Sequence, residues 1–147
     1  MENAEYGKRQ WRNALSGEGE KEAARGGLTG DGKPAAEPVD LAHLARYTLG
    51  DQALEREVLA LFCSQSAAYL ERLRFAESEK DWGDTAHSLK GSALAVGAWR
   101  MARAAERAEA LRSGSPEGER AACIDELDAS LKEADAYIRS VFAARGA

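Results

Sequence analysis

The stretch AHSLKGSALAVGA, residues 86–98, predicts a helix with a glycine in its middle. On a helical wheel at about 100° per residue, the apolar side chains around it gather into one narrow stripe that would face a core. His87 lies well away from this stripe, on the side that a helical bundle leaves in water. The core stripe comprises Trp82, Ala86, Leu89, Ala93 and Val96.

Three small residues and a leucine form a strip beside His87 on that outer side. A glycine inside a helix costs about 0.5–1 kcal/mol relative to alanine, so its presence indicates that something large approaches the backbone. We expect the strip to be exposed and to form the dry centre of a partner-binding surface. It comprises Gly83, Gly91, Leu94 and Ala98.

The chemistry of this surface favours a phosphoryl group. Neutral imidazole has an ordinary pKa of about 6.5, so one ring nitrogen of His87 is a nucleophile near neutral pH. Lys90 follows one turn later, and its ammonium can pair with a group that becomes negative on reaction.

Composition sets wider limits. The chain has 147 residues, of which 44% are apolar and 31% charged, and this predicts one helical domain. A net charge of −5 argues against nucleic-acid binding. No apolar run approaches the roughly 20 residues of a membrane span, and the N-terminus lacks a signal peptide, so we expect a cytoplasmic protein. Cys63 and Cys123 are expected to remain thiols.

The chain divides near Pro38. Half of the 14 glycines precede it, so residues 1–37 are predicted to be a disordered or weakly ordered tail. Within this tail, YGKRQWRNAL could instead form a short helix that docks on a partner or on the domain. Residues 38–147 are predicted to form the helical domain.

Five helices are expected in that domain. A short helix is capped by Asp40 and broken by Gly50, and it precedes helices over about 51–78 and 81–96. A fourth follows the bend at Gly97, and a fifth begins after a turn with Ser115 as its cap. Short connections make neighbouring helices antiparallel, so the predicted fold is an all-α, up-and-down four-helix bundle with a short extra N-terminal helix.

Residues 86–98 resemble the signature of histidine phosphotransfer (HPt) domains, in which a histidine is followed by x-x-Lys-Gly-Ser/Ala and a later glycine. The resemblance extends to DWGDTAHSLKGSA upstream and AERAEAL downstream, and covers about residues 38–145. It implies a phosphorelay intermediate that accepts a phosphoryl group from the aspartyl phosphate of a receiver domain and passes it to another receiver.

The resemblance also implies roles for single residues. His87 would be the phosphoryl acceptor, Lys90 would steady the phosphoryl oxygens, and Gly91 would allow close approach. Glu109 lies where many members place a Gln or Glu that hydrogen-bonds the other imidazole nitrogen, although a solvated surface acid is an equal alternative. No cofactor is expected in this chain, because Mg²⁺ would belong to the partner receiver.

Other functions stay open. Ser88 replaces the acid that commonly follows the histidine in kinase dimerisation helices, and no Gly-rich ATP lid is present, so we expect a monomeric phosphocarrier rather than an enzyme that uses ATP. The main alternative is an HPt-like adaptor that binds receivers or kinases without carrying phosphate. A second is a structural helical module whose small-residue strip packs against another helix. No metal-ligand spacing is present, and His43 is expected to be ordinary surface.

Overall fold

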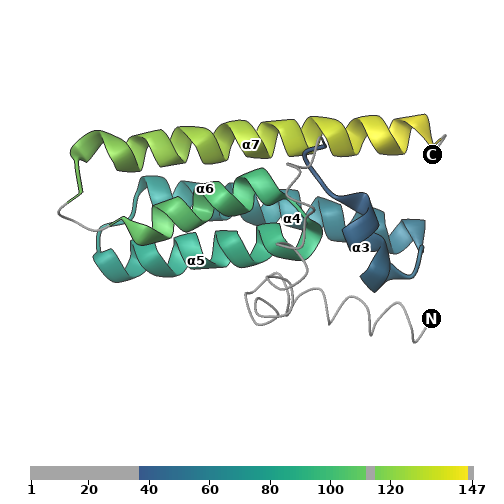
Figure 1. Ribbon diagram of the computed structural model, residues 1–147, viewed down its shortest axis with the longest axis horizontal. Helices are drawn as coiled ribbons and strands as arrows, with labels where there is room; N and C mark the ends of the chain where they lie inside the picture. Colours follow the sequence, from purple (N-terminus) through teal and green to yellow (C-terminus); the bar gives the residue numbers. More distant parts are fainter. Residues whose placement is uncertain (1–36, 112–114, 146–147) are drawn as a thin grey trace.

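The computed structural model describes residues 37–111 and 115–145, and within these ranges all regular structure is helical. This confirms the predicted all-α bundle. The 1–37 tail, including YGKRQWRNAL, lies almost wholly outside the described residues, so its predicted disorder stays a prediction. The helices are α3 (Leu41–Thr48), α4 (Gln52–Arg74), α5 (Glu79–Val96), α6 (Trp99–Ala110) and α7 (Glu117–Ala144) (Figure 1).

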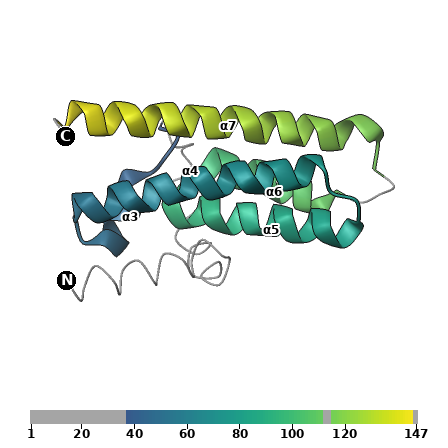
Figure 2. The same ribbon diagram turned by 180° about the vertical axis from the view of Figure 1, so that it is seen from behind.

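Four of the helices form an antiparallel square. α5 packs mainly against α4 and α6, and α7 packs against the same two helices from the other side. The α5–α6 edge and the α4–α7 edge are therefore opposite edges of the square. Figure 1 shows α6 in front of α4, and Figure 2 shows α4 in front in the reverse view, while α3 covers one end of the bundle.

Side-chain caps begin three of the helices. The carboxylates of Asp40 and Asp51 accept hydrogen bonds from backbone N–H groups of the first turns of α3 and α4. The hydroxyl of Ser78 likewise accepts from the N–H of Asp81 at 3.0 Å, so Ser78 begins α5. The expectation that the second helix continues to Ser78 was therefore wrong.

The start of α7 also differs from the prediction. Pro116 occupies the cap position, the helix begins at Glu117, and no side chain caps it, so the expected Ser115 cap was wrong. A proline fits the position before the first turn because its missing N–H needs no partner there.

The core follows the predicted stripes. All five members of the α5 stripe are at most 3% exposed. Along α7, Leu127, Ala134, Ile138 and Phe142 are buried and form a second stripe at helical spacing. The largest fully buried side chains are Phe62, Leu44, Leu59, Leu73, Leu89, Met101 and Leu127.

The start of α3 docks where α5 meets α6. Gly97 ends α5 with φ +77°, and a Cβ atom there would lie 2.7 Å from Cβ of Asp40. The N–H of Asp40 donates to the carbonyl of Gly97 at 3.0 Å, and Nε1 of Trp99 donates to the Asp40 carboxylate at 3.2 Å. Only glycine combines this backbone conformation with so close a neighbour.

This docking overturns two expectations. Ala98, expected on an exposed strip, is 1% exposed because it lies at the junction that α3 covers. His43, expected at the surface, is 5% exposed and packs edge-on against the rings of Tyr47 and Trp99. Burial lowers the pKa of His43 below its ordinary value, despite the nearby Asp40 carboxylate.

Two further observations concern the cysteines and the length of the apolar helices. Cys63 and Cys123 are free thiols, as predicted, and both are half-buried. Over residues 37–111 and 115–145, no helix is long and apolar enough to cross a membrane.

Candidate functional site

The candidate site lies on the α5–α6 edge, where His87 of α5 faces Glu109 of α6. Nδ1 of His87 is 2.8 Å from Oε2 of Glu109. The other oxygen of the same carboxylate, Oε1, is 2.8 Å from Nζ of Lys90. The His87 side chain remains 46% exposed, whereas the side chains of Lys90 and Glu109 are 20% and 30% exposed. One carboxylate therefore contacts both of the α5 side chains that the sequence singled out, at the edge of the bundle.

Packing beneath the site sets the register of the two helices. Nε1 of Trp82 donates a hydrogen bond of 2.7 Å to the carbonyl of Ala108, the residue before Glu109. The guanidinium of Arg120 lies 4.4 Å from the centre of the Trp82 ring and pairs with Glu79 at 2.9 Å. The indole thus ties the start of α5 to the end of α6, and α7 covers the joint.

The electrostatics of the site favour an ionised Glu109. Burial acts to raise the pKa of this carboxyl, but hydrogen bonds from Lys90 and His87 lower it by more, so the pKa lies below its ordinary value. A carboxylate accepts hydrogen bonds only, so the His87 nitrogen that faces it must carry a proton. That arrangement selects the imidazole tautomer with hydrogen on Nδ1.

The predicted strip around His87 is only partly exposed. Gly83 is half-buried with open space where its Cβ would lie, and Leu94 is half-buried. Gly91 is buried, so the expectation that it forms bare, exposed backbone was wrong, as it was for Ala98. In a helix, residues three and four positions away flank a glycine, and here they include His87 and Leu94.

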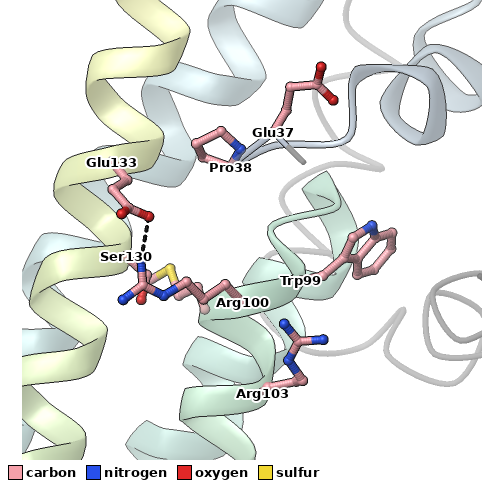
Figure 3. Close-up of a pocket in the computed structure, with 8 residues that line it drawn as sticks. Glu37, Pro38, Trp99, Arg100, Arg103, Ser130 and Glu133 are labelled. Carbon is pink, nitrogen blue, oxygen red and sulfur yellow. Dashed lines mark hydrogen bonds and ion pairs between the residues drawn. The ribbon is translucent and has the colours of Figure 1, made fainter. Parts of the chain in front are cut away.

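A separate small cavity of about 220 Å³ opens where Glu37 and Pro38 pass α6 and α7 (Figure 3). Arg100 pairs there with Glu133 and also, at 2.8 Å, with Glu126. These ion pairs join α6 to α7, and His87 does not line the cavity. Among the described residues, no cluster of three or more His, Cys, Asp or Glu side chains could hold a metal ion.

The structure brings together the three residues that the sequence predicted as site residues, His87, Lys90 and Glu109, and it shows two contacts that the sequence did not predict. Sequence reasoning assigned Lys90 to the phosphoryl group without pairing it with Glu109, and it treated Trp82 as core alone. The spacing of Trp82 along α5 shows that it is buried, but nothing in the sequence identifies the carbonyl that its indole meets. That partner depends on how α5 and α6 are aligned.

Comparison with known families matches residues 57–137 to the Hpt domain. The match covers more than half of the chain and includes the whole candidate site, and the chain belongs to the Hpt domain family. Hpt domains carry phosphoryl groups on histidine within phosphorelays and interact with receiver domains of two-component systems. Searches of curated proteins and of solved structures found no match.

Proposed function

We propose that His87 accepts a phosphoryl group from the aspartyl phosphate of a receiver domain and passes it to a second receiver. The contact between Nδ1 of His87 and the Glu109 carboxylate is the observation that carries this proposal. It holds an exposed imidazole in one tautomer, with the lone pair on Nε2.

The transfer step follows from that tautomer. Nε2 attacks phosphorus, the bond between phosphorus and the aspartyl oxygen breaks, and the receiver's carboxylate leaves with the bonding pair. The proton stays on Nδ1, so the ring becomes positively charged as the new bond forms. The Glu109 carboxylate, 2.8 Å from Nδ1, stabilises that charge where it develops. The same contact serves the reverse step, in which the next aspartate attacks phosphorus.

Lys90 supplies positive charge for the oxygens of the phosphoryl group. Its ammonium has three N–H donors, and one of them is directed at Oε1 of Glu109 at 2.8 Å. Because an ammonium carries three donors, Lys90 can turn one of them toward a phosphoryl oxygen. Glu109 therefore positions Lys90 as well as His87, and its two oxygens couple the two roles.

The receiver would dock around His87, over the exposed imidazole, Lys90, and the half-buried Gly83 and Leu94. Open space at the Cβ position of Gly83 supports close approach there. Mg²⁺ and the acidic pocket for the transfer would come from the receiver. We propose further that the chain acts as a monomer in the cytoplasm without binding nucleic acid, in keeping with its net charge of −5.

Transfer from a receiver tests this function. The full chain is mixed with a receiver domain that carries ³²P on its aspartate, and the label that arrives should be acid-labile and base-stable, as a phosphoramidate is. The sequence contains two histidines, so His43 is the one histidine that remains in His87→Gln. We expect no label on His87→Gln, and full label on a matched His43→Gln variant.

Label that persists on His87→Gln would reject His87 as the acceptor. A folded wild-type chain that binds the receiver but takes no label would instead support an adaptor. Circular dichroism of both variants confirms that the bundle is intact.

A further inference from the structure

A groove lies between α4 and α7, on the edge of the bundle opposite the α5–α6 edge. Its volume is about 700 Å³, and its floor is apolar: Leu59 is fully buried, and Ile138 and Phe142 are less than 10% exposed. The lining residues are Arg56, Leu59, Ala60, Cys63, Ser64, Ala67, Asp128, Leu131, Lys132, Asp135, Ile138, Arg139 and Phe142.

The two walls differ in size. The α4 wall presents small exposed residues at helical spacing, Ala60, Ser64 and Ala67. The α7 wall presents the larger, half-buried side chain of Leu131. The groove thus has small side chains along one wall and a larger side chain on the other, and it extends over about four helical turns. This shape and length suit the packing of another helix. Such a helix would place an apolar residue every three or four positions along the groove.

The Cys63 thiol lies between the walls of the groove and is uncharged. The Cys63 thiol is half-buried, and burial together with the nearby Asp135 carboxylate raises its pKa to about 11. It therefore stays protonated at neutral pH and behaves as a small apolar group rather than a nucleophile.

Along the rims of the groove, the cationic side chains are more exposed to solvent than the carboxylates with which they pair. Asp128 pairs with Lys132 at 2.8 Å, and Asp135 pairs with Arg139 at 3.1 Å. The lysine and arginine side chains are 77% and 79% exposed, whereas the two carboxylates are 32% and 40% exposed. Arg56 adds a third cation, stacked 4.9 Å from the centre of the Phe142 ring. The most exposed of these charges are thus cationic, in a chain of net charge −5.

We infer that the α4–α7 groove docks an amphipathic helix of a partner protein, whose apolar stripe is flanked by acidic residues. The apolar floor and small α4 wall would receive the stripe, and Arg56, Lys132 and Arg139 would pair with the acids. Because the groove and His87 lie on opposite edges of the bundle, the partner and a receiver could bind together. The groove would then hold the phosphocarrier near its partner.

Two designed peptides test the inference on the full chain. Both have about 18 residues, with leucine at heptad spacing, and they differ only in glutamate or lysine beside the leucines. Amide chemical shifts of ¹⁵N-labelled protein report where each one binds. We expect the glutamate peptide to shift Ala60, Ser64, Ala67 and Leu131, and to bind about tenfold more tightly than the lysine peptide.

Variants distinguish binding in the groove from nonspecific binding of the peptide elsewhere on the protein. Ala67→Trp should abolish the shifts by filling the groove, whereas Ala136→Trp, at an exposed α7 position outside the groove, should leave them unchanged. The double variant Lys132→Glu and Arg139→Glu should reverse the preference between the peptides. Transfer to His87 should be unaffected by either peptide.

Three results would overturn the inference. One is no shift in the groove with the glutamate peptide up to about 1 mM. Another is equal binding of the two peptides in both charge backgrounds. The third is a doubled mass in light scattering that Ala67→Trp returns to the monomer, which would assign the groove to a second copy of the chain.

Discussion

The α5–α6 edge and the α4–α7 edge of the bundle differ in how closely their helices approach. α5 and α6 meet through small buried side chains, and a carboxylate on one helix reaches an imidazole on the other at 2.8 Å. α4 and α7 meet around larger side chains and leave a groove of about 700 Å³. The buried alanines of the close edge are Ala86, Ala93, Ala104, Ala105 and Ala108.

This difference shows how one bundle provides two kinds of surface. Close packing brings short polar side chains from two helices together and limits their freedom, which suits a reaction centre. Wider packing leaves apolar surface uncovered, which suits a docked helix. The predictions below test whether the two edges are separate in activity and in stability.

Removing the Glu109 carboxylate should have the largest effect on transfer to His87. Hydrogen bonds to charged groups are worth about 1.5–3 kcal/mol, so Glu109→Ala should slow transfer roughly 10- to 100-fold. Glu109→Gln keeps an acceptor for Nδ1 but loses the charge, and it should be intermediate. Single-turnover transfer from a phosphorylated receiver measures both. Ala67→Trp, in the groove, is the control and should transfer at the wild-type rate. Equal transfer rates for wild type and all variants would show that Glu109 does not contribute to transfer.

The same substitution on each edge should distinguish close packing from open packing. Ala105 is fully buried in α6, so Ala105→Leu should overpack the edge and lower the free energy of unfolding by about 1–3 kcal/mol. Ala67 lines the groove and is exposed, so Ala67→Leu should change it by less than about 0.5 kcal/mol. Urea denaturation measures both. Similar losses for the two variants would contradict the contrast between the edges.

The indole of Trp82 should contribute through its hydrogen bond to the carbonyl of Ala108. Trp82→Phe keeps an aromatic ring under Arg120 but removes the indole donor, so that the carbonyl keeps only the N–H of Leu111, at a cost of about 0.5–1.5 kcal/mol in unfolding free energy. Transfer should also slow, because Ala108 precedes Glu109. Trp99→Phe is the matched control: it removes a similar bond to Asp40 at the α3 junction, so stability should fall while transfer stays unchanged.

The smallest expected effect is a pH dependence of stability from Glu109. Its pKa is lowered in the folded chain, so its stabilising contribution is present above the ordinary value of 4.5 and is lost as pH falls through the lowered value. The difference in unfolding free energy between wild type and Glu109→Gln should be at most about 1 kcal/mol at neutral pH. It should shrink below about pH 4.5. A difference that instead grows on acidification would show that the carboxyl is not ionised in the folded chain.

Sequence patterns predicted much of the fold and part of the site. Helical periodicity separated His87 from the core stripe, and the spacing of three residues placed Lys90 beside it. The resemblance to HPt domains added Glu109, which hydropathy alone leaves as a surface acid. The positions of His87 and Lys90 could be predicted because they depend on the geometry of one helix, whereas Glu109 lies on the next helix and came only from the resemblance.

The failures share a different cause. Ala98 and His43 were judged from their own helices, yet they are buried by the docking of α3 across the α5–α6 junction. The groove was not predicted at all, because its two walls, within residues 56–67 and 128–142, are more than 60 positions apart in the chain.

By itself the sequence determined the helices, the cap of the first one at Asp40, and the outward face that carries His87 and Lys90. Backbone hydrogen bonding and side-chain periodicity are local, so they can be read along the chain. Tertiary structure alone decided which helices approach closely. That choice brought Glu109 to His87, buried Gly91 and left the α4–α7 groove open, since contact between helices depends on the shapes of both partners.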